Sequence, residues 1–320
     1  MNHATKKQHY IWRNYLRSWT GNDSTTGKIV CLRENKIFST SLMNIAHENY
    51  FYNIHPLSEL ERDLIYTVAI EHSTGVQREM SEGWLNLYCA PFDLEKELQR
   101  LSYSTGMQYS NKAEENQEFK HWKIEYIEKL HYLIESMGST NLERIKQEDI
   151  TFWDLEECRN DFSFFVCNQY FRTKRTRDAI ISSFNMTKSK FPNGPFACIR
   201  PENMWIPLAL IYASNVGAKL AHDFSVVLLQ AKKDSFIVGD QPIINTHATL
   251  DTSAPPEEVE FFYPITPHLA LLLTKDPQYI SGTTIELKTQ EIAKYNLLEY
   301  KLSWEQTFAK DKAQLEPFCK

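Results

Sequence analysis

The residues of this chain best suited to chemistry on an anion lie near its beginning. His9, Arg13 and Arg17 recur every four residues in the opening segment. On a helix, this spacing places three side chains along one side. A histidine with a pKa near neutrality beside two guanidinium groups can hold an anion or transfer a proton. The alternative is a helix docked by its aromatic residues, in which these side chains form structural hydrogen bonds.

A second polar group lies in the middle of the chain, at Gln169, Arg172 and Arg177. Gln169 and Arg172 fall about one helical turn apart, and Arg177 follows further along the same predicted helix. Guanidinium groups bind phosphate or carboxylate through paired hydrogen bonds. Salt bridges to acidic residues elsewhere would explain these cations equally well, so a structural role stays open.

The third candidate is Asp240, in a segment (Ser235–Pro242) that resembles a strand followed by a tight turn. A carboxylate at the end of a strand has a rigid backbone and an accessible side chain, as many functional acids do. Aspartate also forms local turns through its own side chain. Taken alone, the pattern around Asp240 favours this local role.

No strong metal or cofactor motif is present. Two Glu-x-x-His pairs, Glu118/His121 and Glu128/His131, lie on one predicted helix about 15 Å apart, so they cannot share a metal pair as residues of facing helices do. We interpret them as partners on the helix surface. The sequence has no HExxH, zinc-type Cys/His cluster, GxSxG, SxxK, Walker A or GxGxxG motif. These absences argue against zinc hydrolases, nucleotide hydrolases of the Walker type and dinucleotide-dependent enzymes.

The elements expected around the first group are short. Residues 8–19 have apolar residues near helical spacing and predict an amphipathic helix. Two β-like runs, Lys28–Arg33 and Lys36–Thr40, predict a hairpin that turns at Glu34-Asn35. A third extended piece is expected at Tyr50–Asn53.

The middle of the chain is predicted to be helical. A long helix is expected over Asn116–Met137, ending at Gly138-Ser139 because glycine commonly terminates helices. Another is expected over Asp154–Ser182, bent near Thr173, and a last one over Pro201–Leu220.

The final third changes to β-like runs punctuated by proline and Asp/Asn, which is typical of an antiparallel sheet. We therefore predict a single α+β domain over residues 1–320, a mainly helical central bundle with an antiparallel sheet from the C-terminal third and a short N-terminal hairpin. Residues 1–55 hold the N-terminal helix and hairpin, 56–222 the helical region and 223–320 the β-rich region. The terminal strands could share one sheet.

Composition is that of an ordinary globular protein, with 42% hydrophobic and 24% charged residues. No apolar stretch is long enough to cross a membrane, no signal peptide is recognisable, and six scattered cysteines fit reduced thiols, so we expect a cytoplasmic protein without membrane contact. The net charge is −6, yet residues 1–20 hold four basic residues and no acidic one, and residues 170–192 hold six basic residues against one acidic. These two segments could bind a nucleic acid or an acidic partner protein, or could be ordinary solvated surfaces.

The same clusters carry a resemblance to a bacterial family known as domain-of-unknown-function family 4238. Gln8-His9-Tyr10 followed by Tyr15-Leu16-Arg17 resembles the opening of its members, and Gln169–Thr173 resembles a Q-x-x-R-T stretch. Further similar segments follow in the family's order: Asn44–Tyr52, Val238–Pro242 and Tyr263–Pro267. Trp12, Gly239 and Gln241 depart from the family pattern. The resemblance implies that a set of residues belongs together as family positions: His9, Arg17, Glu48, Gln169, Arg172 and Asp240.

Our leading hypothesis is a nucleic-acid-directed effector, a phosphodiesterase or nuclease with a role in anti-phage defence. Its proposed catalytic residues are His9, Glu48 and Asp240, and Mg²⁺ is an optional ion. The proposed substrate-binding residues are Arg13, Arg17, Gln169, Arg172 and Arg177. One alternative is a non-catalytic module that binds nucleic acid or protein. Another is an enzyme that acts on a small anionic metabolite, which Arg172 and Arg177 would also suit.

Overall fold

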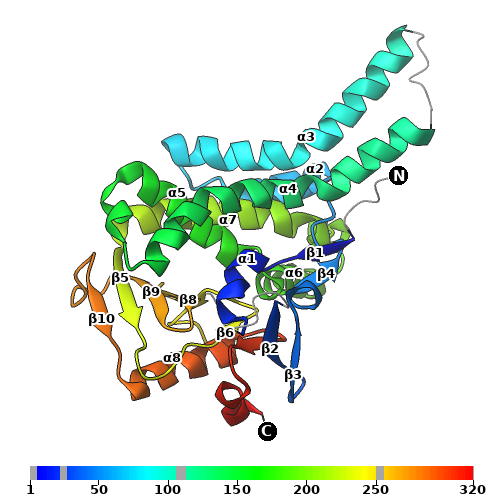
Figure 1. Cartoon of the computed structure of the whole chain (residues 1–320). Coiled ribbons are helices and arrows are strands. Elements are labelled where there is room, and N and C mark those ends of the chain that lie inside the picture. The colour runs from blue at the N-terminus through cyan, green and yellow to red at the C-terminus, as the bar shows by residue number, and fades with distance from the viewer. Residues whose placement is uncertain (1–5, 22–26, 106–112, 250–255, 320) are drawn as a thin grey trace.

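The computed structural model of the chain describes residues 6–21, 27–105, 113–249 and 256–319. Within these residues, long helices form one layer and the strands form sheets against it, with α1 between the two (Figure 1). The predicted α+β class is confirmed.

The helical layer is built around α5 and α7, which pack along each other at its centre. Almost every turn of α7 is buried, and Gly217 in it lets the backbone of α5 come close, since a Cβ there would lie 3.1 Å from the Cα of Phe164. The helices of this layer are α2 (Glu59–Ala69), α3 (Gly75–Thr105), α4 (Ala113–Lys146), α5 (Glu156–Phe171), α6 (Lys174–Lys190) and α7 (Pro201–Asp223).

Two predictions about helix ends had opposite outcomes. The predicted break near Thr173 is confirmed, because α5 ends at Phe171 and the Thr173 side chain caps α6. The predicted end at Gly138 is wrong, because α4 continues to Lys146. A Cβ on Gly138 would lie 2.2 Å from the ring of Phe165 in α5. This glycine therefore permits close packing between two helices and does not end one.

The larger sheet has the strand order β10-β5-β9-β8-β7. All its neighbours are antiparallel, as predicted, except β10, which pairs with β5 in parallel. Both faces are covered: Val226 and Leu228 point into the main core, whereas Val227 and Leu229 pack toward α8 (Thr289–Leu302). The strands are β5 (Ser225–Gln230), β7 (Ile244–Asn245), β8 (Phe261–Thr266), β9 (Leu269–Thr274) and β10 (Thr284–Glu286).

A second sheet joins the two ends of the described chain. Its order is β3-β2-β11-β6, so the N-terminal hairpin pairs with a strand near the C-terminus, as expected. The hairpin turns at Glu34 and Asn35, both of which have positive φ, the conformation that suits tight two-residue turns. The strands are β2 (Lys28–Arg33), β3 (Lys36–Ser41), β6 (Val238–Gly239) and β11 (Thr307–Ala309).

The opening segment differs from the predicted helix over residues 8–19. It begins as a strand, β1 (Lys7–His9), which pairs antiparallel with β4 (His47–Asn49). Only then does α1 (Arg13–Leu16) follow, continued by a 3-10 turn (Arg17–Trp19). The buried side chain of Gln8 explains the strand, because its Oε1 accepts from the Tyr52 backbone at 2.7 Å and its Nε2 donates to the Ile124 carbonyl at 2.9 Å. The predicted strand at Tyr50–Asn53 is a turn that follows β4.

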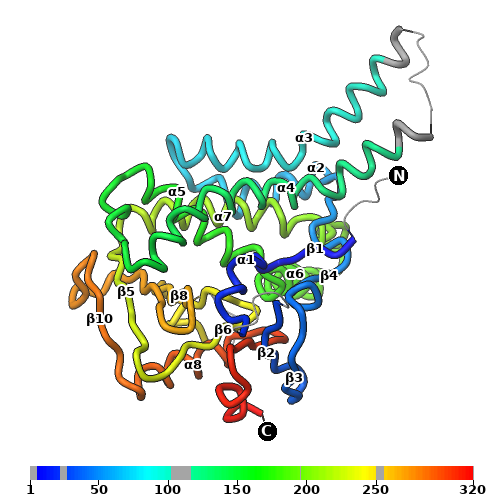
Figure 2. Tube along the Cα trace, in the orientation of Figure 1, coloured from blue at the N-terminus to red at the C-terminus, as the bar shows by residue number. Residues whose placement is uncertain are grey.

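The distal parts of α3 and α4 project away from the rest of the chain (Figure 2). Contacts such as the 2.9 Å ion pair between Lys123 and Glu95 hold the two helices together. Neither these helices nor any other within the described residues is long and apolar enough to cross a membrane.

Candidate functional site

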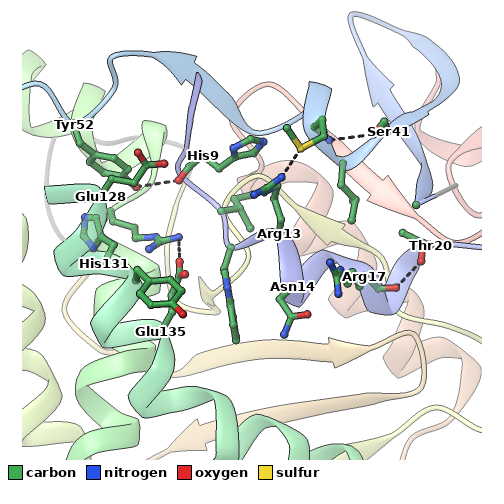
Figure 3. A pocket seen from close by; sticks show the side chains of 17 residues that line it. His9, Arg13, Asn14, Arg17, Thr20, Ser41, Tyr52, Glu128, His131 and Glu135 are labelled. Atoms are coloured by element: carbon green, nitrogen blue, oxygen red, sulfur yellow. Dashed lines mark hydrogen bonds and ion pairs between the residues drawn. The ribbon is translucent and has the colours of Figure 1, made fainter. Parts of the chain in front are cut away.

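A pocket of about 760 Å³ lies between the opening segment and α4 (Figure 3). Four of the residues nominated from the sequence line it: His9, Arg13, Arg17 and Arg172. Four others do not: Glu48, Gln169, Arg177 and Asp240. The pocket lining also includes Trp12, Asn14, Thr20, Ser41, Met43, Tyr52, Glu128, His131, Tyr132 and Glu135.

Three different kinds of local structure bring the basic residues to this pocket. His9 ends strand β1, Arg13 begins α1, and Arg17 begins the 3-10 turn. They do not lie on one helix face as predicted, yet all three line the same wall. Strand alternation sends His9 to the side opposite Gln8 and Tyr10, both of which are buried.

His9 is neutral at physiological pH. Burial, followed by the charges of Arg13 and His47, lowers the pKa of His9 to about 4. Its Nε2 is buried and has no hydrogen-bond partner among the described residues. Buried polar atoms nearly always have partners, so this nitrogen is an unsatisfied acceptor on a residue that lines the pocket.

Arg13 and Arg17 supply the available positive charge. Both side chains are exposed, and neither forms an ion pair with any residue that the structure describes. A contact with Met43 Sδ holds the guanidinium of Arg13. Its charge acts on His9, Glu128 and Glu135. Two guanidinium groups without an acidic partner among the described residues are suited to bind an anion.

A buried ion pair forms part of the pocket floor. Arg172 Nη2 lies 2.6 Å from Glu135 Oε1, and Arg172 Nε donates to the Tyr10 carbonyl at 3.3 Å. His131 sits beside this pair, bonded to Asn168 at 3.1 Å, and burial and then Arg172 lower its pKa well below the usual value. Arg172 is therefore held by the protein, and its charge is compensated.

The interpretation of Glu128 and His131 as surface partners is wrong. His131 is buried, and its ring contacts that of Tyr52 with centroids 4.6 Å apart. Glu128 lines the pocket, where burial and then the charge of Glu125 raise its pKa. Sequence reasoning also missed Glu135. The sequence contains a signal for Glu135, because residues 128, 131 and 135 are spaced so that they share one face of a helix.

Asp240 lies away from the pocket and is fully buried. Its Oδ1 accepts from the Trp304 backbone at 2.6 Å, and its Oδ2 accepts from Glu305 at 2.8 Å and Gln306 at 3.1 Å. Burial raises the pKa of Asp240 to about 6, against the opposing effect of these three N–H groups. The carboxylate therefore holds the turn at residues 304–306, and no contact connects it to His9.

Glu48 and Arg177 bind each other outside the pocket. Arg177 donates to both carboxylate oxygens of Glu48, at 2.7 and 3.3 Å, and Lys174 lies 3.5 Å away. Burial alone would raise the pKa of Glu48, but Arg177 and Lys174 outweigh it and lower the pKa. Gln169 is buried in α5, and its Nε2 has no partner among the described residues.

Most cations of the basic segment 170–192 are bonded within the protein, and Arg172, Lys174 and Arg177 are paired with acidic residues. Besides Arg172 and Arg177, Lys174 bonds Glu305 at 2.6 Å, Arg175 the Leu302 carbonyl at 2.7 Å and Lys188 the Ile199 carbonyl at 2.8 Å. In segment 1–20, residues 1–5 lie outside the described part of the chain, and Arg13 and Arg17 face the pocket. Binding of a nucleic acid or an acidic partner through these segments stays a prediction.

The residues around the pocket suit an anion better than a metal ion. In the part of the chain that the structure describes, no three His, Cys, Asp or Glu side chains converge on a cation position. Mg²⁺ prefers carboxylate oxygens, yet Glu135 is bonded to Arg172, and burial and the charge of Glu125 raise the pKa of Glu128. Positive charges at Arg13 and Lys7 flank the His9–His47 pair. The optional Mg²⁺ therefore finds no suitable ligand set in this pocket.

Comparison with known proteins places the chain in one family. No curated protein and no solved structure is detectably similar to it. The model of a family described as protein of unknown function (DUF4238) matches residues 7–193. The match includes the opening strand and α1, the pocket-lining part of α4, and Arg172. The chain therefore belongs to the DUF4238 family.

Proposed function

We propose that the pocket binds a phosphate ester and cleaves it without a metal ion, so that the protein is a phosphodiesterase acting on nucleic acid. The observation that carries this proposal is the pairing of an unpartnered, neutral His9 with the unpaired cation of Arg13. Arg17 adds a second cation on the same wall. Positioned cations stabilise the charge that develops on phosphoryl oxygens, and a neutral imidazole can accept the proton of the attacking hydroxyl.

The steps follow from these positions. His9 Nε2 takes the proton as the attacking oxygen bonds to phosphorus, and Arg13 stabilises the phosphoryl oxygens. As the bond to the leaving oxygen breaks, protonated Glu128 gives its proton to the leaving group, a role that its raised pKa assists. Without a ligand, His9 is a weak base, because its pKa is about 4. A phosphate anion bound beside the ring would raise that pKa toward neutrality.

The test is incubation of the purified protein with labelled RNA, single-stranded DNA and duplex DNA, in EDTA and with added Mg²⁺ or Mn²⁺. We expect cleavage in EDTA, reduced about 100-fold or more by His9→Gln. The matched control is His72→Gln, because His72 is exposed and has no hydrogen bond or ion pair within the described residues. Absence of cleavage, or equal rates for wild type and His9→Gln, would refute the proposal.

A non-catalytic anion-binding module is the second candidate function. It is favoured by a specific observation: Glu48 and Asp240, the two carboxylates nominated as catalytic, are bonded to other parts of the protein. In that case the same substrates would bind, Arg13→Gln would weaken binding, and none would be cleaved.

The role in anti-phage defence is a separate prediction, as is the cytoplasmic location that it requires. Expression in bacteria should arrest growth or protect the cells from phage, and His9→Gln should abolish the effect. If wild type does neither, the defence role is refuted while the proposed chemistry still stands.

A further inference from the structure

Aromatic side chains line the same pocket as the basic residues. Tyr132 belongs to the lining, yet the residue is 70% exposed, so it lies at the edge of the pocket and much of its side chain is open to solvent. Trp12 is half-buried on the opening segment, directly before Arg13. An aromatic ring open to solvent beside bound anions is the arrangement on which nucleic-acid bases stack.

The position of Tyr132 follows from the geometry of α4. Glu128, His131, Tyr132 and Glu135 are spaced i, i+3, i+4 and i+7, and all four line the pocket. Tyr132 is therefore on the face that carries the proposed proton donor Glu128. Leu133, its neighbour, is similarly exposed at 60% but is not part of the lining.

The pocket is also too large for a phosphate group alone. Its volume of about 760 Å³ lies within the range of roughly 300–1,000 Å³ that is typical of sites for drug-sized ligands. Asn14, Thr20 and Ser41 add polar groups to the lining. The amide of Asn14 makes no hydrogen bond to any described residue, so it is available to a sugar or a base.

We propose that the ligand of this pocket is a nucleoside phosphate, with its phosphate on Arg13 and Arg17 and its base stacked on Tyr132 and Trp12. The inference rests on the proposed function for the phosphate position and adds recognition of the base. Because duplex bases are already stacked on their neighbours, the ligand is a free nucleotide or an unpaired nucleotide of a single strand.

The experiment is calorimetry in EDTA with adenosine 5′-monophosphate, uridine 5′-monophosphate, ribose 5-phosphate and inorganic phosphate. We expect each nucleotide to bind roughly tenfold more tightly than ribose 5-phosphate, since stacking on one ring has about that effect. Tyr132→Ala should remove this advantage without changing the affinity for ribose 5-phosphate. Tyr132→Phe should retain the advantage, and the control Leu133→Ala should behave as wild type.

The outcomes separate the two proposals. If ribose 5-phosphate binds as tightly as the nucleotides and Tyr132→Ala changes nothing, base recognition is refuted, while phosphate binding that is weakened by Arg13→Gln still supports the proposed function. If no phosphate compound binds, both proposals fail. A single-stranded pentanucleotide that binds more tightly than the free nucleotides would identify a strand as the source of the ligand, and the reverse would identify a free nucleotide. A duplex that binds as tightly as the single strand would overturn the inference.

Discussion

Two regions of the molecule hold the residues that sequence patterns nominate for chemistry, and they differ in how their polar atoms are satisfied. At the turn over residues 304–306, both oxygens of Asp240 accept backbone N–H groups and no part of the carboxylate is exposed. In the pocket, Arg13 and Arg17 have no ion-pair partner among the described residues, and His9 Nε2 has no hydrogen bond.

The difference shows that residue type alone does not distinguish a binding group from a structural one. A carboxylate and an imidazole are equally capable of proton transfer, but only a group with an unused hydrogen-bonding atom can act on a ligand. Arg172 makes the same point inside the pocket lining, because its guanidinium is already paired with Glu135. Substitution of a polar group that is already bonded within the protein should lower stability. Substitution of a polar group without such a bond should weaken ligand binding.

The largest effect is expected from breaking the Arg172–Glu135 pair. Arg172→Met leaves the carboxyl of Glu135 buried without its partner and should lower the free energy of unfolding by about 3–5 kcal/mol. The double variant Arg172→Met/Glu135→Leu removes both charges and should recover most of that loss. Urea denaturation of the three proteins measures the coupling. A single variant as stable as wild type would show that Arg172 is not a structural cation.

Asp240→Ala should be nearly as damaging. It leaves the buried N–H of Gln306 and the partly buried N–H groups of Trp304 and Glu305 without their acceptor, so we expect a loss of about 3 kcal/mol. Asp63→Ala is the matched control, because Asp63 is exposed and unpartnered among the described residues. Thermal and urea unfolding provide the measurement. An Asp240→Ala protein with unchanged stability but no nuclease activity would restore Asp240 as a catalytic residue.

Gly138→Ala tests the close packing of α4 against α5. This packing positions Glu128 and Glu135, which lie on α4. The added methyl group would overlap the Phe165 ring, and overpacking of this kind costs about 1–3 kcal/mol. Gly83→Ala in α3 is the control, since no atom lies within 4 Å of its Cβ position and alanine should stabilise the helix by about 0.5–1 kcal/mol. Equal effects of the two substitutions on the melting temperature would contradict the packing argument.

The smallest expected effect is the pH dependence contributed by His9. Its pKa is lowered from 6.5 to about 4 by burial, then by Arg13 and His47, so the folded state binds fewer protons than the unfolded state between these values. The contribution of His9 to stability is therefore fully present above pH 6.5 and is lost as the pH falls through about 4. Because the ring is partly exposed, we expect wild type to lose about 1 kcal/mol relative to His9→Gln between pH 7 and pH 4.

Nuclear magnetic resonance titration of the His9 ring gives the direct measurement. An apparent pKa near 6.5 would mean that His9 is as well hydrated as a free imidazole, and the contrast with Asp240 would then be lost.

Much of the fold could be predicted from sequence where the signal is local. The hairpin over β2 and β3 follows from alternating residues around a turn, and the break before α6 follows from a threonine cap. What could not be predicted depends on distant partners. Gln8 lies in a strand because its side chain is hydrogen-bonded to the backbone of Tyr52 and Ile124. Gly138 lies within a helix because the ring of Phe165 occupies the space that a side chain would need.

The candidate site was predictable in the same partial way. His9, Arg13 and Arg17 could be nominated from their residue types. They still line one pocket, although His9 lies on a strand and not on the predicted helix. The spacing of Glu128 and Glu135 places them on one helix face, but it could not assign them to the pocket, because it gives no sign of which segment covers that face. Whether a polar group is already bonded, as in Asp240 and Glu48, depends on contacts with residues far away in the chain.

The pairing of β2 with β11 has a consequence for how the chain is made. Val30 is paired in register with Ala309, so strand β2 gains its second neighbour only after the roughly 275 residues between the two strands have been made. At about 5–20 residues per second, that interval is on the order of tens of seconds on the ribosome. The β2–β3 hairpin should therefore emerge with one open edge, which is free to pair with other chains until β11 has been made.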